Sequence, residues 1–79
     1  MFFISLRHEQ HTREYVLSAS RPSGWELTLQ EDLERTRRIH FEDWHRVERA
    51  VAVVKLEVEH LTARGWRVEH ASRGGVLES

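Results

Sequence analysis

The chain has 79 residues, and its 12 Lys plus Arg against 13 Asp plus Glu give a formal net charge of −1, so the molecule as a whole has no field that attracts nucleic acid or anionic lipid. It contains no Cys, which excludes disulfides and thiolate metal sites. A domain this small buries only about 60% of the surface that its unfolded chain exposes, so we expect oligomerisation to add stability.

Four segments in the first half of the chain alternate apolar with polar residues, the period of strands that have one buried face. They lie at residues 2–7, 15–19, 25–30 and 35–41. The connections between them fall at residues 8–11, at the turn-forming run 21–24 and at the acidic pair 31–32. This pattern predicts four antiparallel strands, with a helical turn at residues 33–38 as the alternative for the start of the fourth.

A long amphipathic helix is predicted from Asp43 to Arg64. Its first apolar stripe has the alternating spacings of three and four that a buried helix face requires, at Trp44, Val47, Val51, Val54, Val58 and Leu61. Asp43 has the side chain of an N-cap, and Gly65 can take the left-handed conformation that ends a helix. Beyond the helix, alternation at residues 66–71 predicts a short fifth strand or an extended arm.

A second stripe runs along roughly the opposite side of this helix. Its members are Arg49, Ala52, Val53, Leu56, His60 and Ala63. One apolar stripe is enough for a helix to cover its own sheet, so the second stripe indicates a further contact with another molecule. We expect a homodimer joined through the long helix. A satisfied structural role for His60 is favoured over a pH-sensitive one.

The elements together predict an α+β fold, an antiparallel four-stranded meander followed by one long helix on one sheet face. We expect residues 1–71 to form a single domain and residues 72–79 a flexible tail. The apolar opening at residues 1–4 is far shorter than the roughly 20 residues of a membrane helix. We therefore expect no membrane association and a cytoplasmic location.

Candidate catalytic and metal sites are sparse in this sequence. His40, Asp43 and His45 lie close together, but the two His are five residues apart across the helix start, whereas ligands on one helix face are three or four apart. The chain lacks a HExxH pattern, a glycine-flanked serine and a phosphate-binding glycine loop. We expect a non-enzymatic homodimeric module that binds or organises another macromolecule, with no cofactor and no metal. A His-dependent metal-binding protein is the least favoured alternative.

The remaining alternative is binding of single-stranded nucleic acid across the outer sheet face. Arg35, Arg37 and Arg38 form a basic run on the fourth predicted strand, and Arg7 lies on the first. At the level of element order, over roughly residues 2–64, the plan resembles that of PC4-like and Whirly-like single-stranded DNA-binding proteins. The resemblance implies dimers whose strands grip DNA. In the nucleic-acid alternative, the basic run and Arg7 would contact phosphates.

Overall fold

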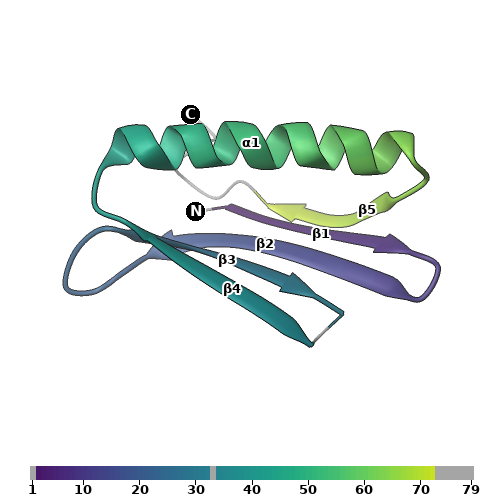
Figure 1. The fold of residues 1–79 in the computed structure, drawn as a ribbon, viewed down its shortest axis with the longest axis horizontal. Helices are drawn as coiled ribbons and strands as arrows, with labels where there is room; N and C mark the ends of the chain where they lie inside the picture. The colour runs from purple at the N-terminus through teal and green to yellow at the C-terminus, as the bar shows by residue number, and fades with distance from the viewer. Residues whose placement is uncertain (1, 33, 73–79) are drawn as a thin grey trace.

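The structure is a computed structural model that describes residues 2–32 and 34–72. Within them, five strands form one antiparallel sheet, and a long helix follows the fourth strand (Figure 1). The elements are β1 (Phe2–His8), β2 (His11–Ala19), β3 (Trp25–Glu31), β4 (Arg35–Phe41), α1 (Trp44–Ala63) and β5 (Arg67–Ser72). The predicted α+β meander followed by one long helix is confirmed, and residues 35–38 belong to a strand rather than to a helical turn.

The strand order is β4-β3-β2-β1-β5. The first four strands are therefore a meander, while β5 returns along the free edge of β1 with one register shift between Ser5 and Leu6. The predicted C-terminal arm is thus a paired strand that continues through Ser72. The rest of the predicted tail, residues 73–79, lies outside the described residues.

Strand alternation places the apolar side chains on the sheet face that α1 covers. Cross-strand partners share a face, and Tyr15 lies opposite both Ile4 and Leu29. Tyr15 is fully buried, and Leu17 is buried beside it. The buried helix residues Val47, Val51 and Val54 complete this core, so the first predicted stripe does face the sheet.

Both ends of α1 are formed by the predicted residues. The side chain of Asp43 accepts a 3.0 Å hydrogen bond from the backbone N–H of His45, which satisfies one free amide of the first turn. At the other end Gly65 has φ 105°, and the N–H of Trp66 donates to the carbonyl of Leu61 at 3.0 Å. The helix therefore stops one residue before the predicted Arg64.

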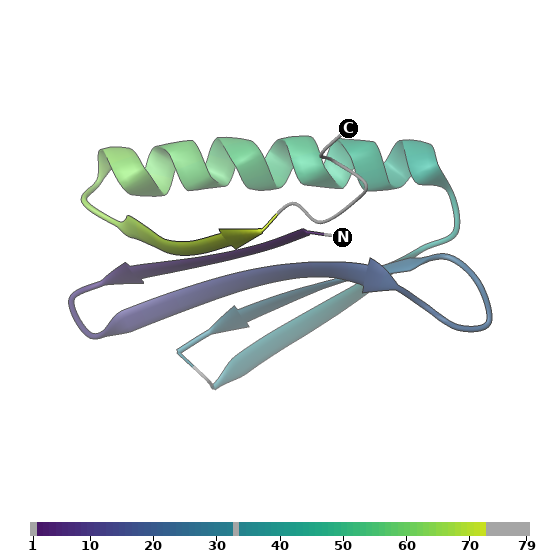
Figure 2. The same cartoon turned by 180° about the vertical axis from the view of Figure 1, so that it is seen from behind.

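The β3–β4 hairpin diverges from the helix at its tip. In Figures 1 and 2 the end of β3 and the start of β4 lie farthest from α1, whereas β5 and β1 lie nearest to it. Asp32 adopts φ 53° in this connection, a left-handed conformation that Asp tolerates without glycine. All residues of β4 except Phe41 are exposed, so the first half of this strand extends beyond the core.

Candidate functional site

The second stripe of α1 forms one solvent-exposed surface, which we call the outer face. It consists of Arg49, Ala52, Val53, Leu56, His60 and Ala63, and all six residues are exposed. Val53 and Leu56 are 55% and 57% exposed, although neighbouring Val54 is only 3% exposed. The described strands of the same chain thus leave this face uncovered.

A polar cluster connects the sheet to α1 on the helix's opposite side. Arg13 Nη2 lies 2.7 Å from Glu31 Oε2, and Arg13 Nη1 lies 3.9 Å from Glu57 Oε1 on the helix. The hydroxyl of Tyr15 donates a 2.7 Å hydrogen bond to the same Glu57 oxygen. The guanidinium of Arg13 also stands 5.8 Å from the ring centroid of Trp66. These contacts tie β2, β3 and the segment after α1 to the helix.

Burial and hydrogen bonding shift the pKa values of this cluster. Burial first, and then the hydrogen bond to Glu57, raise the pKa of the Tyr15 phenol to about 12. Burial alone would lower the pKa of Arg13, but the hydrogen bond with Tyr15 and the nearby carboxylates raise it above its ordinary value. At neutral pH the cluster therefore holds a neutral phenol and a charged guanidinium.

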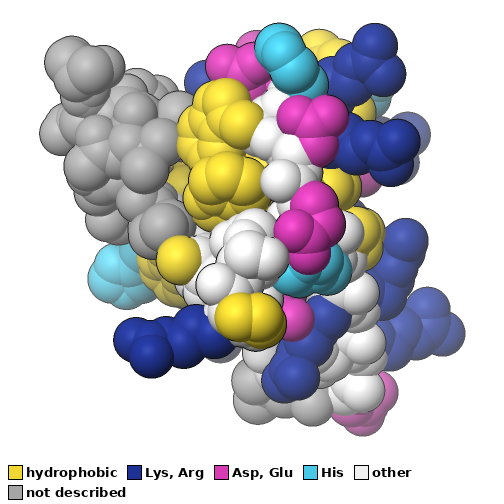
Figure 3. Space-filling view, turned by 90° about the vertical axis from the view of Figure 1, so that its left-hand side faces the viewer, with side chains coloured by type: hydrophobic (Ala, Val, Ile, Leu, Met, Phe, Trp, Pro, Cys, Tyr) yellow, Lys and Arg dark blue, Asp and Glu magenta, His cyan; other side chains and the backbone are white. Residues whose placement is uncertain are grey.

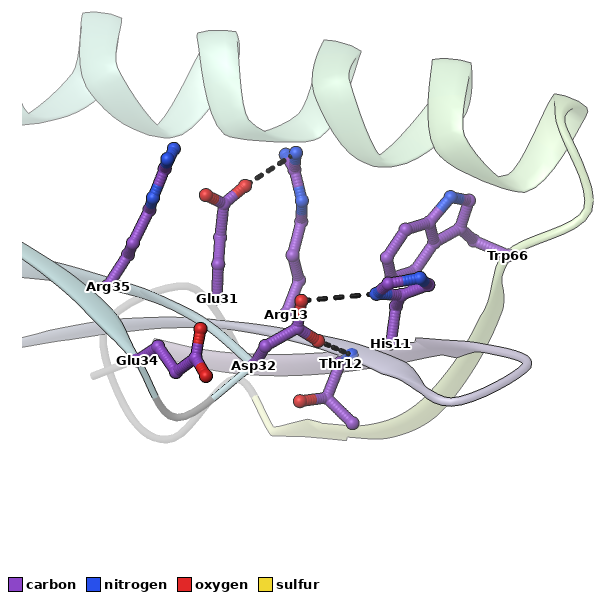
Figure 4. Close-up of a pocket in the computed structure, with 8 residues that line it drawn as sticks. All are labelled: His11, Thr12, Arg13, Glu31, Asp32, Glu34, Arg35 and Trp66. Atoms are coloured by element: carbon purple, nitrogen blue, oxygen red, sulfur yellow. Dashed lines mark hydrogen bonds and ion pairs between the residues drawn. The ribbon is translucent and has the colours of Figure 1, made fainter.

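A second polar cluster, formed by Asp32, His11 and Thr12, lies near the tip of the β3–β4 hairpin. These residues line a hollow of about 470 Å³ together with Arg13, Glu31 and Trp66 among others. Figure 4 shows Asp32 connected to both His11 and Thr12. Asp32 Oδ1 accepts a 2.8 Å hydrogen bond from the Thr12 N–H, and Oδ2 lies 3.1 Å from Nδ1 of His11. The Thr12 hydrogen bond and then the His11 contact lower the pKa of Asp32.

The His residues of the strand-to-helix junction have separate partners. His40 Nε2 lies 2.7 Å from Oε2 of Glu42, whose other oxygen accepts a 3.1 Å hydrogen bond from the Ser23 hydroxyl. Asp43 is engaged as the helix cap, and His45 Nδ1 lies 3.8 Å from Glu48. In the described part of the chain, no three His, Asp or Glu side chains are grouped so that they could hold a metal ion.

The four Arg predicted to contact nucleic acid are divided between two faces of the sheet. Arg35 lies opposite Glu31 and Arg37 opposite Leu29, so both share the helix-covered face, and Figure 4 shows Arg35 pointing toward α1. Arg38 alternates with them and lies on the sheet face that points away from α1. Arg7 lies on the same sheet face as Arg38, and its side chain pairs with Glu69 at 3.8 Å. The four side chains therefore do not form a single patch.

Sequence reasoning missed the role of Arg13 and the contact of Trp66 with His8. Arg13 has the same strand parity as the buried Tyr15 and Leu17, and this signal places its side chain on the helix-covered face. Trp66 stacks on His8 with ring centroids 5.4 Å apart. This contact brings together residues that are far apart in the sequence, because β5 pairs with β1. Local sequence patterns do not predict such a pairing.

Comparison of the chain with protein-family models, with curated proteins and with solved structures found no match. The described helix is too polar to cross a membrane.

Proposed function

We propose that this chain is a small, non-enzymatic, cytoplasmic interaction module that forms a homodimer through the outer face of α1 and presents its sheet to another macromolecule. The observation that carries the proposal is the exposure of Val53 and Leu56 on a helix whose other stripe packs on its own sheet through the buried Val47, Val51 and Val54. Two apolar side chains in the middle of an exposed helix face supply the anchor that an interface requires.

The arrangement of the outer face supports a second copy as its occupant. Leu56 lies near the centre of the face, with Arg49 and His60 on either side of it along α1. In a two-fold interface the same patch serves both partners, so Leu56 would meet its counterpart and the polar residues would form a rim. A partly buried Leu or Val gains part of the roughly 1.5–3 kcal/mol that full burial contributes. A small domain without Cys benefits from such an addition.

Single-stranded nucleic-acid binding draws less support from the geometry. An open outer sheet face would need a continuous basic surface, and Arg35 and Arg37 share the helix-covered face instead. The outer sheet face carries Glu14 and Glu26 between Arg7 and Arg38, which weakens the local positive potential. We therefore do not propose it as a second function.

Cysteine cross-linking tests the self-association directly, because the natural chain has no Cys. Leu56→Cys places a thiol at the centre of the proposed interface, and mild oxidation should give a disulfide-linked pair of chains at low micromolar concentration. Lys55→Cys is the matched control, since Lys55 is exposed on the same helix but lies to the side of the outer face. Equal cross-linking of the two variants, or none with Leu56→Cys, would refute the proposed interface.

A further inference from the structure

Strand β4 is an open edge of the sheet. It is the first strand in the order β4-β3-β2-β1-β5, so only β3 pairs with it, and a row of its backbone N–H and C=O groups has no strand partner among the described residues. Six of its seven residues are exposed, and only Phe41 is partly buried. Such an edge can accept a further strand through main-chain hydrogen bonds.

Strand β4 carries three Arg and no acidic residue, although Glu31, Glu34 and Glu57 lie around its helix-covered side. None of Arg35, Arg37 and Arg38 forms an ion pair with a described residue. Glu31, the cross-strand neighbour of Arg35, is engaged by Arg13 at 2.7 Å. Figure 3 shows several dark blue Lys and Arg side chains along the right-hand side of the face in view, with Asp and Glu side chains near them. The edge therefore favours a partner with negative charge.

A second copy of β4 is a poor occupant for the same reason. In a symmetric antiparallel pair centred on Thr36, Arg35 would lie opposite the partner copy's Arg37. Centring the pair on Arg37 or on Arg38 would place that Arg directly opposite itself. Like charges in directly opposed positions destabilise a strand pair, so the arginines disfavour self-pairing along most of the edge.

The helix-covered side of this edge has room for side chains of an added strand. A hollow of about 560 Å³ opens between β4 and α1. Its lining has three arginines and three glutamates, together with Leu29 and Thr36: Arg13, Arg35, Arg37, Glu31, Glu34 and Glu57. Arg13 lies 2.7 Å from Glu31 and 3.9 Å from Glu57, so Arg35 and Arg37 keep their guanidinium groups for carboxylates of an added strand. Next to it on the same face, Ile39 is 38% exposed. The hollow offers guanidinium groups to carboxylates, and Ile39 offers an apolar contact.

We propose that the β4 edge binds an extended acidic segment of a partner protein, which adds as a sixth strand. Main-chain hydrogen bonds supply affinity in this mode, and the alternate side chains supply specificity. Alternate Glu or Asp side chains of the segment lie beside Arg35 and Arg37 on the helix-covered face. The site uses no residue of the outer face of α1, so it does not depend on self-association.

The test measures binding of a fluorescent synthetic peptide that alternates Glu with Val, by anisotropy, with a Lys–Val peptide as the charge control. We expect the acidic peptide to bind at low salt, the basic peptide not to bind, and added salt to weaken binding because the charges are exposed. The double variant Arg35→Glu/Arg37→Glu should weaken binding by about tenfold or more. Arg21→Glu/Arg46→Glu makes the same change of net charge at exposed positions outside β4 and should change the affinity by less than about twofold.

Amide hydrogen exchange of the complex distinguishes strand addition from loose charge attraction. Peptide binding should slow exchange at alternate amides of β4, whose N–H groups point away from β3. Binding without new protection in β4, or equal weakening by the two double variants, would overturn the proposal. So would an Arg35- and Arg37-dependent complex with a single-stranded oligonucleotide when the acidic peptide does not bind. Failure of this test leaves the cross-linking result at Leu56 unaffected.

Discussion

The hydroxyl of Tyr15 donates a 2.7 Å hydrogen bond to Oε1 of Glu57, and this contact joins the middle strand of the sheet to the helix. Tyr15 is fully buried, while the Glu57 side chain is about half exposed. The bond lets a large aromatic side chain fill the core and still satisfy its one polar group at the edge of the helix. It also holds Glu57 beside Arg13, at the wall of the hollow between β4 and α1.

Tyr15→Phe should lower the free energy of unfolding by about 1 kcal/mol, because it removes this hydrogen bond but keeps the aromatic ring. The loss is modest since Glu57 is exposed enough to regain water. Urea denaturation monitored by circular dichroism measures it, and Glu57→Gln, which keeps an acceptor oxygen, should cost less. A Tyr15→Phe variant as stable as the natural chain would show that the hydrogen bond contributes nothing.

The ionisation of Tyr15 should be visible directly, because the chain contains one Tyr. Burial first, and then the bond to Glu57, raise the pKa from 10.0 to about 12. The folded state thus holds the proton more tightly than the unfolded state, so this contribution to stability is fully present below pH 10 and is lost as pH rises through about 12. Phenolate absorbance during an alkaline titration should show a midpoint well above 10 in the folded chain. A midpoint near 10 would contradict the buried, bonded position.

Asp32 should make the free energy of unfolding depend on pH in the acid range. The Thr12 N–H first, and His11 second, lower its pKa below 3.8, so its contribution is present above that pH and is lost as pH falls through the lowered value. Asp32→Asn keeps an acceptor for the Thr12 N–H and tolerates the left-handed backbone, but it removes the charge. Denaturant midpoints measured from neutral pH down to acid should fall less steeply for Asp32→Asn. Parallel profiles would show that the carboxylate is not coupled to folding.

Adjacent valines on α1 separate folding from association. Val54 is 3% exposed, and Val54→Ala should cost roughly 2 kcal/mol of folding stability for its two lost methyl groups. Val53 is 55% exposed, so Val53→Ala should leave the isolated chain nearly unchanged while weakening the proposed dimer. Urea denaturation at low protein concentration measures the first effect, and its dependence on concentration measures the second. A large folding cost at Val53 with no change in association would contradict this assignment.

Two glycines should differ in how they tolerate a side chain. Gly65 has φ 105° and its added Cβ would lie 3.4 Å from the flexible His8 ring, so Gly65→Ala should cost about 1 kcal/mol or slightly more. Gly24 has φ 86° and its Cβ would lie 2.4 Å from the backbone carbonyl of Phe41, which cannot easily yield. Gly24→Ala should therefore be the more destabilising change. Thermal denaturation gives the order, and the reverse order would contradict the close approach of Gly24 to β4.

Local patterns were sufficient to predict most of the fold. Alternation at Trp25, Leu27 and Leu29 and the stripe through Val47, Val51 and Val54 indicated which faces are buried. The partner of β5 could not be predicted, because its pairing with β1 joins opposite ends of the chain and leaves no local signal.

The candidate surfaces were harder to predict than the elements. Exposure of Val53 and Leu56 follows from helical spacing, so the outer face of α1 could be named from the sequence. Arg35 and Arg37 were predicted to contact nucleic acid on the outer sheet face, but their cross-strand partners place them on the helix-covered face. Whether α1 covers them depends on the divergence of the hairpin from the helix. That divergence depends on the twist of the sheet and on the position of the helix, and neither can be predicted from the spacing of residues in the sequence.

The most direct test of the proposed self-association is sedimentation equilibrium of the natural chain and of Leu56→Glu over about 1–100 μM. Leu56 is 57% exposed, so the substitution removes little packing within one chain and the variant should stay folded. We predict that the natural chain sediments as two chains in this range, and that Leu56→Glu sediments as one because it places a charge in the apolar centre of the interface. A natural chain that sediments as a single folded chain throughout would contradict the account.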